Sequence, residues 1–372
     1  MPPFRGTSQQ DQLLQPPQQQ FPMQASPMQA SPIQASPTPT GQPATAPIGE
    51  EEMQRVRAVL DQISAVYADT IVGQQELRIS LLVTLMARGH ILLESVPGLA
   101  KTTAAATLAR AVKASFARIQ CTPDLLPSDI IGTQVFDGST SSFRTQLGPV
   151  HAHFVLLDEI NRSSAKTQSA MLEAMQERQT SIGGTIYPLP SPFMVLATQN
   201  PIEEEGTYVL PQAQMDRFLL KEVISYPDPA AEVEVLRRVD HSAPNAQSGP
   251  PGVSLDDVSF LQDLLGRVFI ADAIRHYIVA IVNATRRPAG ILDAAMAGYL
   301  EYGVSPRGAI ALQQVARAIA LINGRGHVIP EDVKVLRHSA LRHRLVLNFD
   351  AVASKVQPES IIDAVFRAVR TP

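Results

Sequence analysis

The sequence predicts an α/β fold, in which a parallel five-stranded sheet with helices on both faces is followed by a smaller, all-helical domain. Five short apolar segments alternate with helical segments, a pattern typical of parallel strands joined by helices; they lie near residues 90–94, 116–120, 153–157, 193–197 and 218–224. After residue 227 the strand pattern disappears. Helical periodicity then marks segments near residues 230–239, 254–268, 272–286, 307–323, 330–346 and 358–370.

The chain divides into a tail and two folded parts. Its 372 residues exceed a single compact core, so we predict an α/β core at 51–226 and a helical domain at 227–372. Residues 1–50 are different, because Pro22-Met23-Gln24-Ala25-Ser26 recurs with little change at 27–31 and 32–36. Such a segment buries too little apolar surface to offset the entropy of ordering it, so we expect a disordered tail.

Composition excludes several classes of protein. The formal charge of −4, without a basic tract, gives no support for a nucleic-acid or membrane-surface partner. Cys121 is the single cysteine, which rules out an intramolecular disulfide and fits a reducing compartment. No secretion signal is visible, and no apolar run approaches the roughly 20 residues of a membrane-spanning helix. We therefore expect a soluble, cytoplasmic protein.

The segment from Leu92 to Thr102 ends an apolar strand with a turn that suits a nucleoside triphosphate. In such a P-loop, backbone N–H groups surround the β-phosphate, Lys101 reaches the β/γ oxygens and Thr102 is a magnesium ligand. Ser95 and Ala100 stand where the usual pattern has glycine. The alternative is an ordinary helix start with an exposed lysine. The predicted nucleotide contacts are Ser95, Val96, Pro97, Gly98, Leu99, Ala100, Lys101, Thr102 and Thr103.

A second apolar strand, at 153–157, ends in the carboxylates Asp158 and Glu159. Parallel strands present ligand-binding groups at their carboxyl ends, so this segment has the character of a Walker B motif. Asp158 is then expected at the Mg²⁺ ion, and Glu159 is expected to orient the water that attacks the γ-phosphate. In the alternative interpretation, Asp158 caps the helix predicted over 161–178.

Two further polar residues follow or precede strands of the same sheet. Asn200 comes after the strand at 193–197 and is a candidate for positioning the attacking water, although Asn-Pro also opens turns. Arg217 precedes the last strand, and it either pairs with Asp216 or projects across a subunit boundary. An arginine supplied in trans to a γ-phosphate contributes about 10³–10⁵ in rate.

Ser305-Pro306-Arg307 is typical of a helix start, because serine caps the helix and proline suits its first position. Arg307 then falls in the first turn, where the helix dipole also favours an anion. We expect Arg307 to contact the γ-phosphate and so to convert nucleotide state into an angle between the domains. The structural alternative is a solvated arginine at a helix start.

Together these segments resemble the AAA+ ATPases, and others are similar to the MoxR branch of that family. The latter are Val72-Gly73-Gln74, Asp158-Glu159-Ile160-Asn161-Arg162, Lys166-Thr167-Gln168, Leu172-Glu173-Ala174-Met175-Gln176-Glu177-Arg178, Ala197-Thr198-Gln199-Asn200-Pro201 and Glu205-Gly206-Thr207-Tyr208. The resemblance covers roughly residues 50–370. Ser95 departs from the family, and so does Gln212, where the family usually has a glutamate.

The resemblance implies an AAA+ P-loop core and a C-terminal helical lid that carries the sensor 2 arginine. The cofactors would be ATP and Mg²⁺, and the copies would form a ring, expected to be hexameric, in which each site is completed by its neighbour. Val72 and Gly73 would lie against the adenine, and Thr102 and Asp158 would serve the metal. The catalytic residues would be Glu159, Asn200, Arg217 and Arg307.

The implied activity is the ATP-driven remodelling or maturation of partner protein complexes, including help with metal-cofactor insertion, often with von Willebrand factor A domain partners. The resemblance identifies 129–148 as the insert in the second core helix, and Gly183-Gly184 within 180–187 predicts a hairpin. That hairpin has no Lys or Arg for nucleic-acid phosphates, which favours protein clients. A small-molecule P-loop kinase and a nucleotide-gated, non-hydrolytic scaffold are the alternatives.

Overall fold

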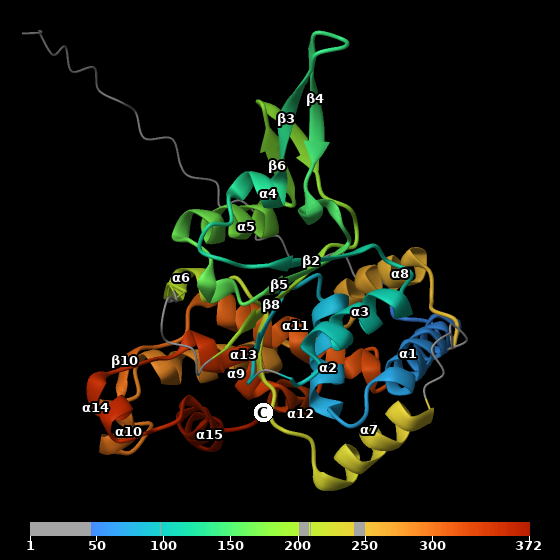
Figure 1. Cartoon of the computed structure of the whole chain (residues 1–372). Coiled ribbons are helices and arrows are strands. Elements are labelled where there is room, and N and C mark those ends of the chain that lie inside the picture. The colour runs from blue at the N-terminus through green and yellow to red at the C-terminus, as the bar shows by residue number, and fades with distance from the viewer. Residues whose placement is uncertain (1–45, 97, 201–207, 209, 242–249) are drawn as a thin grey trace, which may run out of the picture. The chain divides into compact units, whose positions relative to one another are not determined.

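The computed structural model describes residues 46–96, 98–200, 208, 210–241 and 250–372 (Figure 1). Residues 1–45 of the predicted tail and Pro97 of the predicted P-loop lie outside the described residues. The first helix, α1, covers Glu50–Thr70. The described residues belong to one compact unit.

The predicted five-stranded parallel sheet is confirmed, with the strand order β2-β5-β8-β1-β9. Its strands are β1 (Ile91–Glu94), β2 (Phe116–Gln120), β5 (Phe154–Asp158), β8 (Met194–Gln199) and β9 (Leu220–Val223). All neighbouring pairs are parallel, and Glu94 is aligned with Gln199. The carboxyl ends of β5, β8 and β1 therefore meet at one edge of the sheet.

Alternate residues of the strands face different layers of helices, as the period-2 geometry of a strand requires. On β1, Leu93 packs with the layer formed by α1, α2 (Gln75–Met86) and α3 (Lys101–Ala111), whereas Leu92 packs against α5 (Ala165–Glu177). Phe154 and Val155 divide in the same way on β5. Both faces of the central strands β5, β8 and β1 are thus buried, which explains why these strands are almost continuously apolar.

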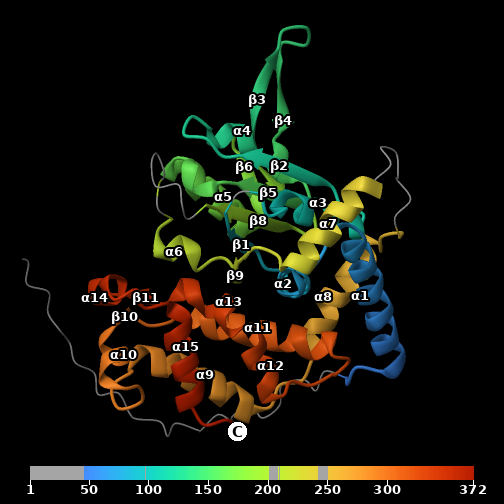
Figure 2. The ribbon, with the colours of Figure 1, turned by 60° about the horizontal axis from the view of Figure 1, so that its bottom comes forward.

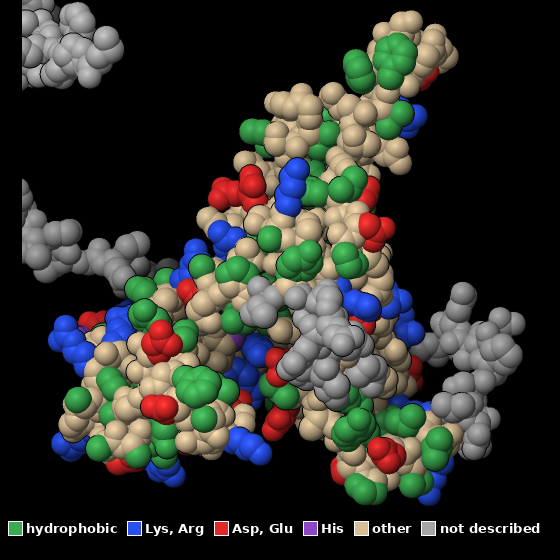
Figure 3. Space-filling model, turned by 60° about the vertical axis from the view of Figure 1, so that its left-hand side comes forward, with side chains coloured by type: hydrophobic (Ala, Val, Ile, Leu, Met, Phe, Trp, Pro, Cys, Tyr) green, Lys and Arg blue, Asp and Glu red, His purple; other side chains and the backbone are tan. Residues whose placement is uncertain are grey.

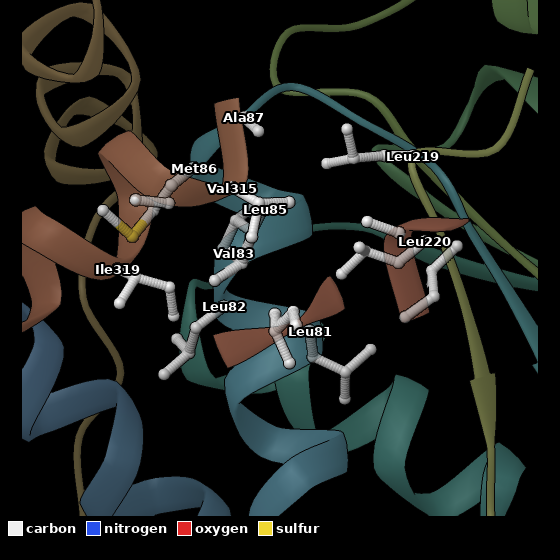
Figure 4. Close-up of a cluster of buried hydrophobic side chains, with 14 of the residues drawn as sticks. Leu81, Leu82, Val83, Leu85, Met86, Ala87, Leu219, Leu220, Val315 and Ile319 are labelled. Carbon is white, nitrogen blue, oxygen red and sulfur yellow. The ribbon is translucent and has the colours of Figure 1, made fainter. Parts of the chain in front are cut away.

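The C-terminal region shares the buried core of α2 and does not form a separate one. In Figure 4, Val315 and Ile319 of α11 lie against Leu85 and Leu82 of α2. Figure 2 shows the C-terminal helices on the side of the sheet that α2 occupies. They are α8 (Leu255–Arg267), α9 (Asp272–Arg286), α10 (Ala294–Gly298), α11 (Pro306–Ile322), α12 (Pro330–Val335), α13 (Arg337–Leu341), α14 (Phe349–Ala353) and α15 (Pro358–Ala368).

The prediction that this region is entirely helical is wrong in one detail. β10 (Leu300–Tyr302) and β11 (Val346–Leu347) form a short antiparallel sheet, and the helix predicted over 330–346 is divided between α12, α13 and a 3₁₀ turn at 342–344. Strands of two and three residues leave almost no periodic signal, so this sheet was not visible in the sequence.

Two hairpins project from the other side of the molecule. The insert predicted at 129–148 begins within α4 (Pro127–Ile131) and contains a ribbon of β3 (Gly132–Asp137) and β4 (Ser142–Leu147). The predicted second hairpin is confirmed as β6 (Gln179–Ile182) and β7 (Thr185–Pro188), with positive φ at both turn glycines. Figure 3 shows apolar side chains exposed on this arm, which include Val135, Phe136, Phe143 and Ile186.

The remaining helices are α6 (Gln212–Met215), just before β9, and α7 (Pro229–His241), which connects the sheet to the C-terminal region. None of the helices in the described residues is long and apolar enough to cross a membrane.

Candidate functional site

The P-loop segment turns sharply into α3 without a glycine at its last position. Ala100, immediately before α3, has the left-handed conformation (φ 53°), and Gly98 has a φ of 89°. The Lys101 ammonium donates to the carbonyl of Ser95 at 3.1 Å, so the lysine folds back over the loop. Ser95 is buried, and its N–H donates to the carbonyl of Gln199 on β8 (3.3 Å). The loop is therefore tied to the carboxyl edge of the sheet, with the first N–H groups of α3 available to an anion.

An apolar cavity of about 390 Å³ opens beside this loop. Five residues expected to contact the nucleotide line it, namely Val72, Gly98, Leu99, Ala100 and Thr103. The other lining residues are Val235 and Leu236 of α7 together with Thr70, Ile71, Gln74, Pro227 and Glu232. Gly73 does not line the cavity; it forms the turn beside it, with a φ of 68°. The apolar residues of α7 were visible in the sequence, but an apolar helix face ordinarily indicates packing against the core. The sequence therefore did not reveal that α7 lines this cavity.

The two carboxylates at the end of β5 have different hydrogen-bond partners. Asp158 is buried, and its Oδ2 accepts from Arg118 on β2, from Nη2 at 2.5 Å and from Nε at 3.1 Å. Glu159 has a left-handed backbone (φ 58°), and its Oε2 accepts from Arg162 at 2.9 Å and from Gln120 at 3.2 Å. Asp158 is the last residue of the strand and Glu159 precedes a 3₁₀ turn, so Asp158 does not cap α5, whose cap is Ser164.

Thr198 links these carboxylates to the neighbouring strand. Its hydroxyl donates to Asp158 Oδ1 at 2.7 Å and accepts from the N–H of Glu159 at 2.8 Å. Asn200, two residues further along, is also buried and follows β8 between the ends of β5 and β1. The sheet thus brings Asn200, Asp158 and Glu159 to the edge where the P-loop begins. Sequence reasoning placed Thr198 in a motif but gave it no role.

Cys121 lies behind these carboxylates and takes no chemical part. Its N–H donates to the carbonyl of Asp158 at 2.9 Å, and its side chain is buried. Burial raises the pKa of the thiol to about 12, with a smaller contribution from the negative charges of Asp158 and Glu159. The thiol therefore stays protonated and is a poor nucleophile.

Arg217 and Arg307 lie together near the amino-terminal end of β1, on the side of the sheet opposite to the carboxyl ends where the P-loop begins. Both line a cavity of about 300 Å³ whose wall includes Gly89 and His90, the two residues before β1. The P-loop follows the same strand at its other end. Within one chain, therefore, the structure does not bring Arg307 to Lys101. The position of a helix start was predictable, but where that helix packs was not, because packing depends on distant parts of the chain.

The suggestion that Arg217 pairs with Asp216 is not supported by the geometry. Asp216 Oδ1 accepts from Arg344 Nε (2.8 Å), and its Oδ2 accepts from the hydroxyl of Ser305 (2.8 Å). Arg217 Nε is buried and has no hydrogen-bond partner among the described residues. Of the arginines that line the cavity, Arg344 is paired with Asp216 and Arg88 with Asp263. Arg217 and Arg307 form no ion pair among the described residues.

Family comparisons agree with this geometry. The pattern described as "ATPase family associated with various cellular activities (AAA)" matches residues 90–220, and the AAA lid domain pattern matches residues 292–365. The chain is 48% identical over 302 residues to Chaperone MoxR1 of Mycobacterium tuberculosis. The aligned region covers 81% of this chain and 79% of that protein. The chain belongs to the MoxR-type AAA+ ATPases.

Two other relatives of this MoxR-type chain are similar over most of their length. Protein YeaC of Bacillus subtilis is 43% identical, over 81% of this chain and 91% of that protein. The crystal structure of a candidate ATPase from Cytophaga hutchinsonii superposes with a TM-score of 0.82 at 45% identity, covering 87% of this chain and 98% of the other. The predicted family and fold class are thereby confirmed, and the lid pattern coincides with the region that contains Arg307.

Proposed function

We propose that this MoxR-type protein hydrolyses ATP to ADP and phosphate in a Mg²⁺-dependent reaction and uses the energy to remodel partner proteins. The observation that supports this most is the meeting of the P-loop, Asp158, Glu159 and Asn200 at one edge of a parallel sheet. In open α/β sheets this edge is where ligands bind. The apolar cavity beside Gly98 fits the adenine, and the start of α3 fits the phosphates.

The residues present fit a magnesium ion. A hydroxyl from Thr102, in the first turn of α3, and a carboxylate from Asp158 are the hard oxygen ligands that Mg²⁺ prefers, either directly or through water. When bound, the ion would neutralise charge on the β- and γ-phosphates. Asp158 is already held by Thr198 and Arg118, so its carboxylate keeps one orientation before any ion arrives.

Each remaining group at this edge has a separate task. Lys101 would place its positive charge on the β/γ oxygens, moving from the carbonyl of Ser95, which it now contacts. Glu159 would accept a hydrogen bond from the attacking water and polarise it, and Asn200 would fix the position of that water. Such positioning, together with electrostatic stabilisation, is most of what phosphoryl transfer requires of a protein.

We infer that the arginines come from another copy of the chain. Arg217 and Arg307 share one cavity at the edge of the sheet away from the P-loop, so they cannot serve the nucleotide of their own chain without a rearrangement of the buried core. In a ring, head-to-tail contacts bring opposite edges of adjacent copies together. This arrangement supports shared ATPase sites and counts against a small-molecule kinase, which has no need of a second copy.

The proposed partners are proteins. The hairpin arm exposes apolar and aromatic side chains, including Phe136 and Phe143, whose rings meet edge to face at 5.4 Å, and it has few cations for nucleic acid. One relative is named a chaperone. Because α2 and α11 share a buried core, we propose that core and lid move together and that hydrolysis changes the angle between copies. The described residues do not select a von Willebrand factor A partner or a metal-cofactor client.

The test compares Glu159→Gln with the wild-type protein, and with Glu51→Gln as a control at an exposed position on α1. Glu159→Gln should bind ATP with unchanged affinity and should lose hydrolysis by about 100-fold or more. Glu51→Gln should hydrolyse ATP normally, and removal of Mg²⁺ should abolish turnover. Equal, low turnover in all three proteins would instead support the non-hydrolytic scaffold. Client proteins retained by the ATP-bound Glu159→Gln variant would identify the partners.

A further inference from the structure

The arginine cavity contains a carboxylate that joins the two elements carrying Arg217 and Arg307. We propose that Asp216 is a positioning residue that holds both arginines in one fixed arrangement, an inference that rests on the proposed role of those arginines in hydrolysis. Asp216 precedes Arg217 in the chain, and it contacts the helix cap that precedes Arg307.

The contact to the Arg307 side is made through Ser305. The Ser305 hydroxyl donates to Asp216 Oδ2 at 2.8 Å and accepts from the N–H of Arg307 at 3.1 Å. Ser305 is therefore both the N-cap of α11 and a hydrogen-bond donor to Asp216. A shift of Asp216 would move this cap, and with it the first turn of α11, in which Arg307 lies.

The contact to the Arg217 side is made through Arg344, which is almost fully buried. Arg344 Nε donates to Asp216 Oδ1 at 2.8 Å, and Arg344 Nη2 donates to the backbone carbonyls of Asp216 (3.3 Å) and Phe218 (2.7 Å). These two carbonyls flank Arg217. The backbone that carries Arg217 is thus held on both sides by one guanidinium, in the planar, multidentate geometry that arginine offers.

Close packing makes the arrangement rigid. A Cβ added to Gly308 of α11 would lie 2.1 Å from Val304 Cγ1 and 3.1 Å from Arg344 Cδ. The glycine therefore lets the helix approach the buried arginine. Only Asp216 gives Arg344 a carboxylate partner among the ion pairs of the described residues. This leaves the charges of Arg217 and Arg307 for an anion at the mouth of the cavity.

The arrangement predicts that the two arginines act as a unit through Asp216. In Asp216→Asn, one acceptor oxygen becomes an amide donor, so the amide cannot accept from both Ser305 and Arg344 as the carboxylate does. Displacement of a catalytic group by about 1 Å can cost on the order of 100-fold in rate. Because the nucleotide pocket of the same chain is untouched, kcat should fall while KM for ATP stays nearly constant.

The experiment measures ATP hydrolysis by the full-length, assembled protein for Asp216→Asn, Arg217→Ala and the double variant. We expect kcat of Asp216→Asn to fall about 10- to 100-fold, with KM within about 2-fold of wild type. The double variant should fall less, relative to Arg217→Ala, than Asp216→Asn falls relative to wild type, because only the effect of Asp216 on Arg307 remains. Asp263→Asn is the matched control, since Asp263 pairs with Arg88 at the same cavity and forms no ion pair with Arg217 or Arg307 among the described residues.

Several results would overturn the inference. Unchanged kcat in Asp216→Asn would do so, and so would a loss that multiplies fully with that of Arg217→Ala, since this indicates an independent structural effect. If Asp216→Asn does not fold, Ser305→Ala replaces it and should lower kcat several-fold through Arg307, with KM for ATP nearly unchanged. An unchanged kcat in Ser305→Ala would contradict the inference. If Arg217→Ala itself keeps full activity, the proposed role of the arginine fails first.

Discussion

Thr198 donates its hydroxyl to Asp158 at 2.7 Å and accepts from the N–H of Glu159 at 2.8 Å, so one side chain from β8 fixes both carboxylates at the end of β5. The hydroxyl is completely buried. A buried hydroxyl with both its donor and its acceptor in use makes a rigid connection. It joins the strand before Asn200 to the residues that would serve the metal and the attacking water.

Replacing this hydroxyl with a methyl group should damage catalysis more than folding. In Thr198→Val, which has the same shape, the Glu159 N–H loses its acceptor and Asp158 loses a donor, at a cost of about 1–3 kcal/mol in stability. We expect kcat to fall by about 10-fold or more, because the carboxylates lose their fixed orientation. Thr198→Ser keeps the hydroxyl and should remain active. Equal activity of the two variants in steady-state ATPase assays would contradict this role.

The cavity beside the P-loop should determine nucleotide affinity. Leu236 on α7 lines the cavity although its side chain is 66% exposed. Leu236→Ala should raise KM for ATP several-fold and leave kcat nearly unchanged, because contact with the base is the same in the ground and transition states. Val233→Ala is the control, since Val233 lies on the same helix outside the cavity lining. A similar KM in both variants would mean that α7 does not contact the base.

The left-handed residue before α3 should tolerate glycine. A non-glycine residue at positive φ costs about 1–2 kcal/mol, which offsets the entropy that glycine loses on folding. We therefore expect Ala100→Gly to change the free energy of unfolding little, or to raise it by up to about 1 kcal/mol. Ala106→Gly, in the interior of α3, should lower it by about 1 kcal/mol. Urea unfolding distinguishes the two, and equal destabilisation would contradict the conformational argument.

His90 should make stability depend on pH. It is buried before β1, where Nδ1 accepts from the N–H of Val195 (3.0 Å) and Nε2 donates to the carbonyl of Met175 (3.2 Å). Burial lowers its pKa to about 4, from 6.5 for an exposed histidine. Between these values the unfolded chain binds the proton and the folded chain does not, so stability is present above pH 6.5 and is lost as pH falls toward 4.

This dependence can be measured by urea unfolding at pH 7.5 and pH 5. Between pH 7.5 and pH 5, protonation of His90 in the unfolded chain should lower the free energy of unfolding by on the order of 2 kcal/mol. His90→Asn keeps an acceptor for the Val195 N–H and cannot titrate, so its fall should be smaller than that of the wild type. The exposed His276 provides a control, and His276→Asn should retain the wild-type dependence. An unchanged fall in His90→Asn would exclude His90 as its source.

The sequence predicted those features that depend on local periodicity and on strand ends. Apolar runs predicted the buried strands β1, β5 and β8, and because the strands are parallel, the polar residues at their ends had to meet at one edge. Ser95 and Ala100 were visible as departures from a glycine pattern, and the structure gives them a buried hydrogen bond and a left-handed cap.

Features that depend on packing between distant segments were not predictable. The start of α11 was evident from Ser305, but the cavity that Arg307 shares with Arg217 depends on how the C-terminal helices pack on α2. The role of Asp216 requires Arg344, which is 128 positions away. Leu236 was indistinguishable from an ordinary apolar helix residue, although it faces a cavity.

The central claim is that each ATPase site combines the P-loop of one copy with the arginines of the next, and mixing impaired variants tests it most directly. Lys101→Ala and Arg217→Ala should each retain only a small residual ATPase activity alone. When the two are co-assembled in equal amounts, a boundary with an intact Lys101 and an intact Arg217 should restore up to about a quarter of wild-type ATPase activity. Co-assembled rings that remain at this residual activity, with mixing verified by native mass spectrometry, would contradict the account.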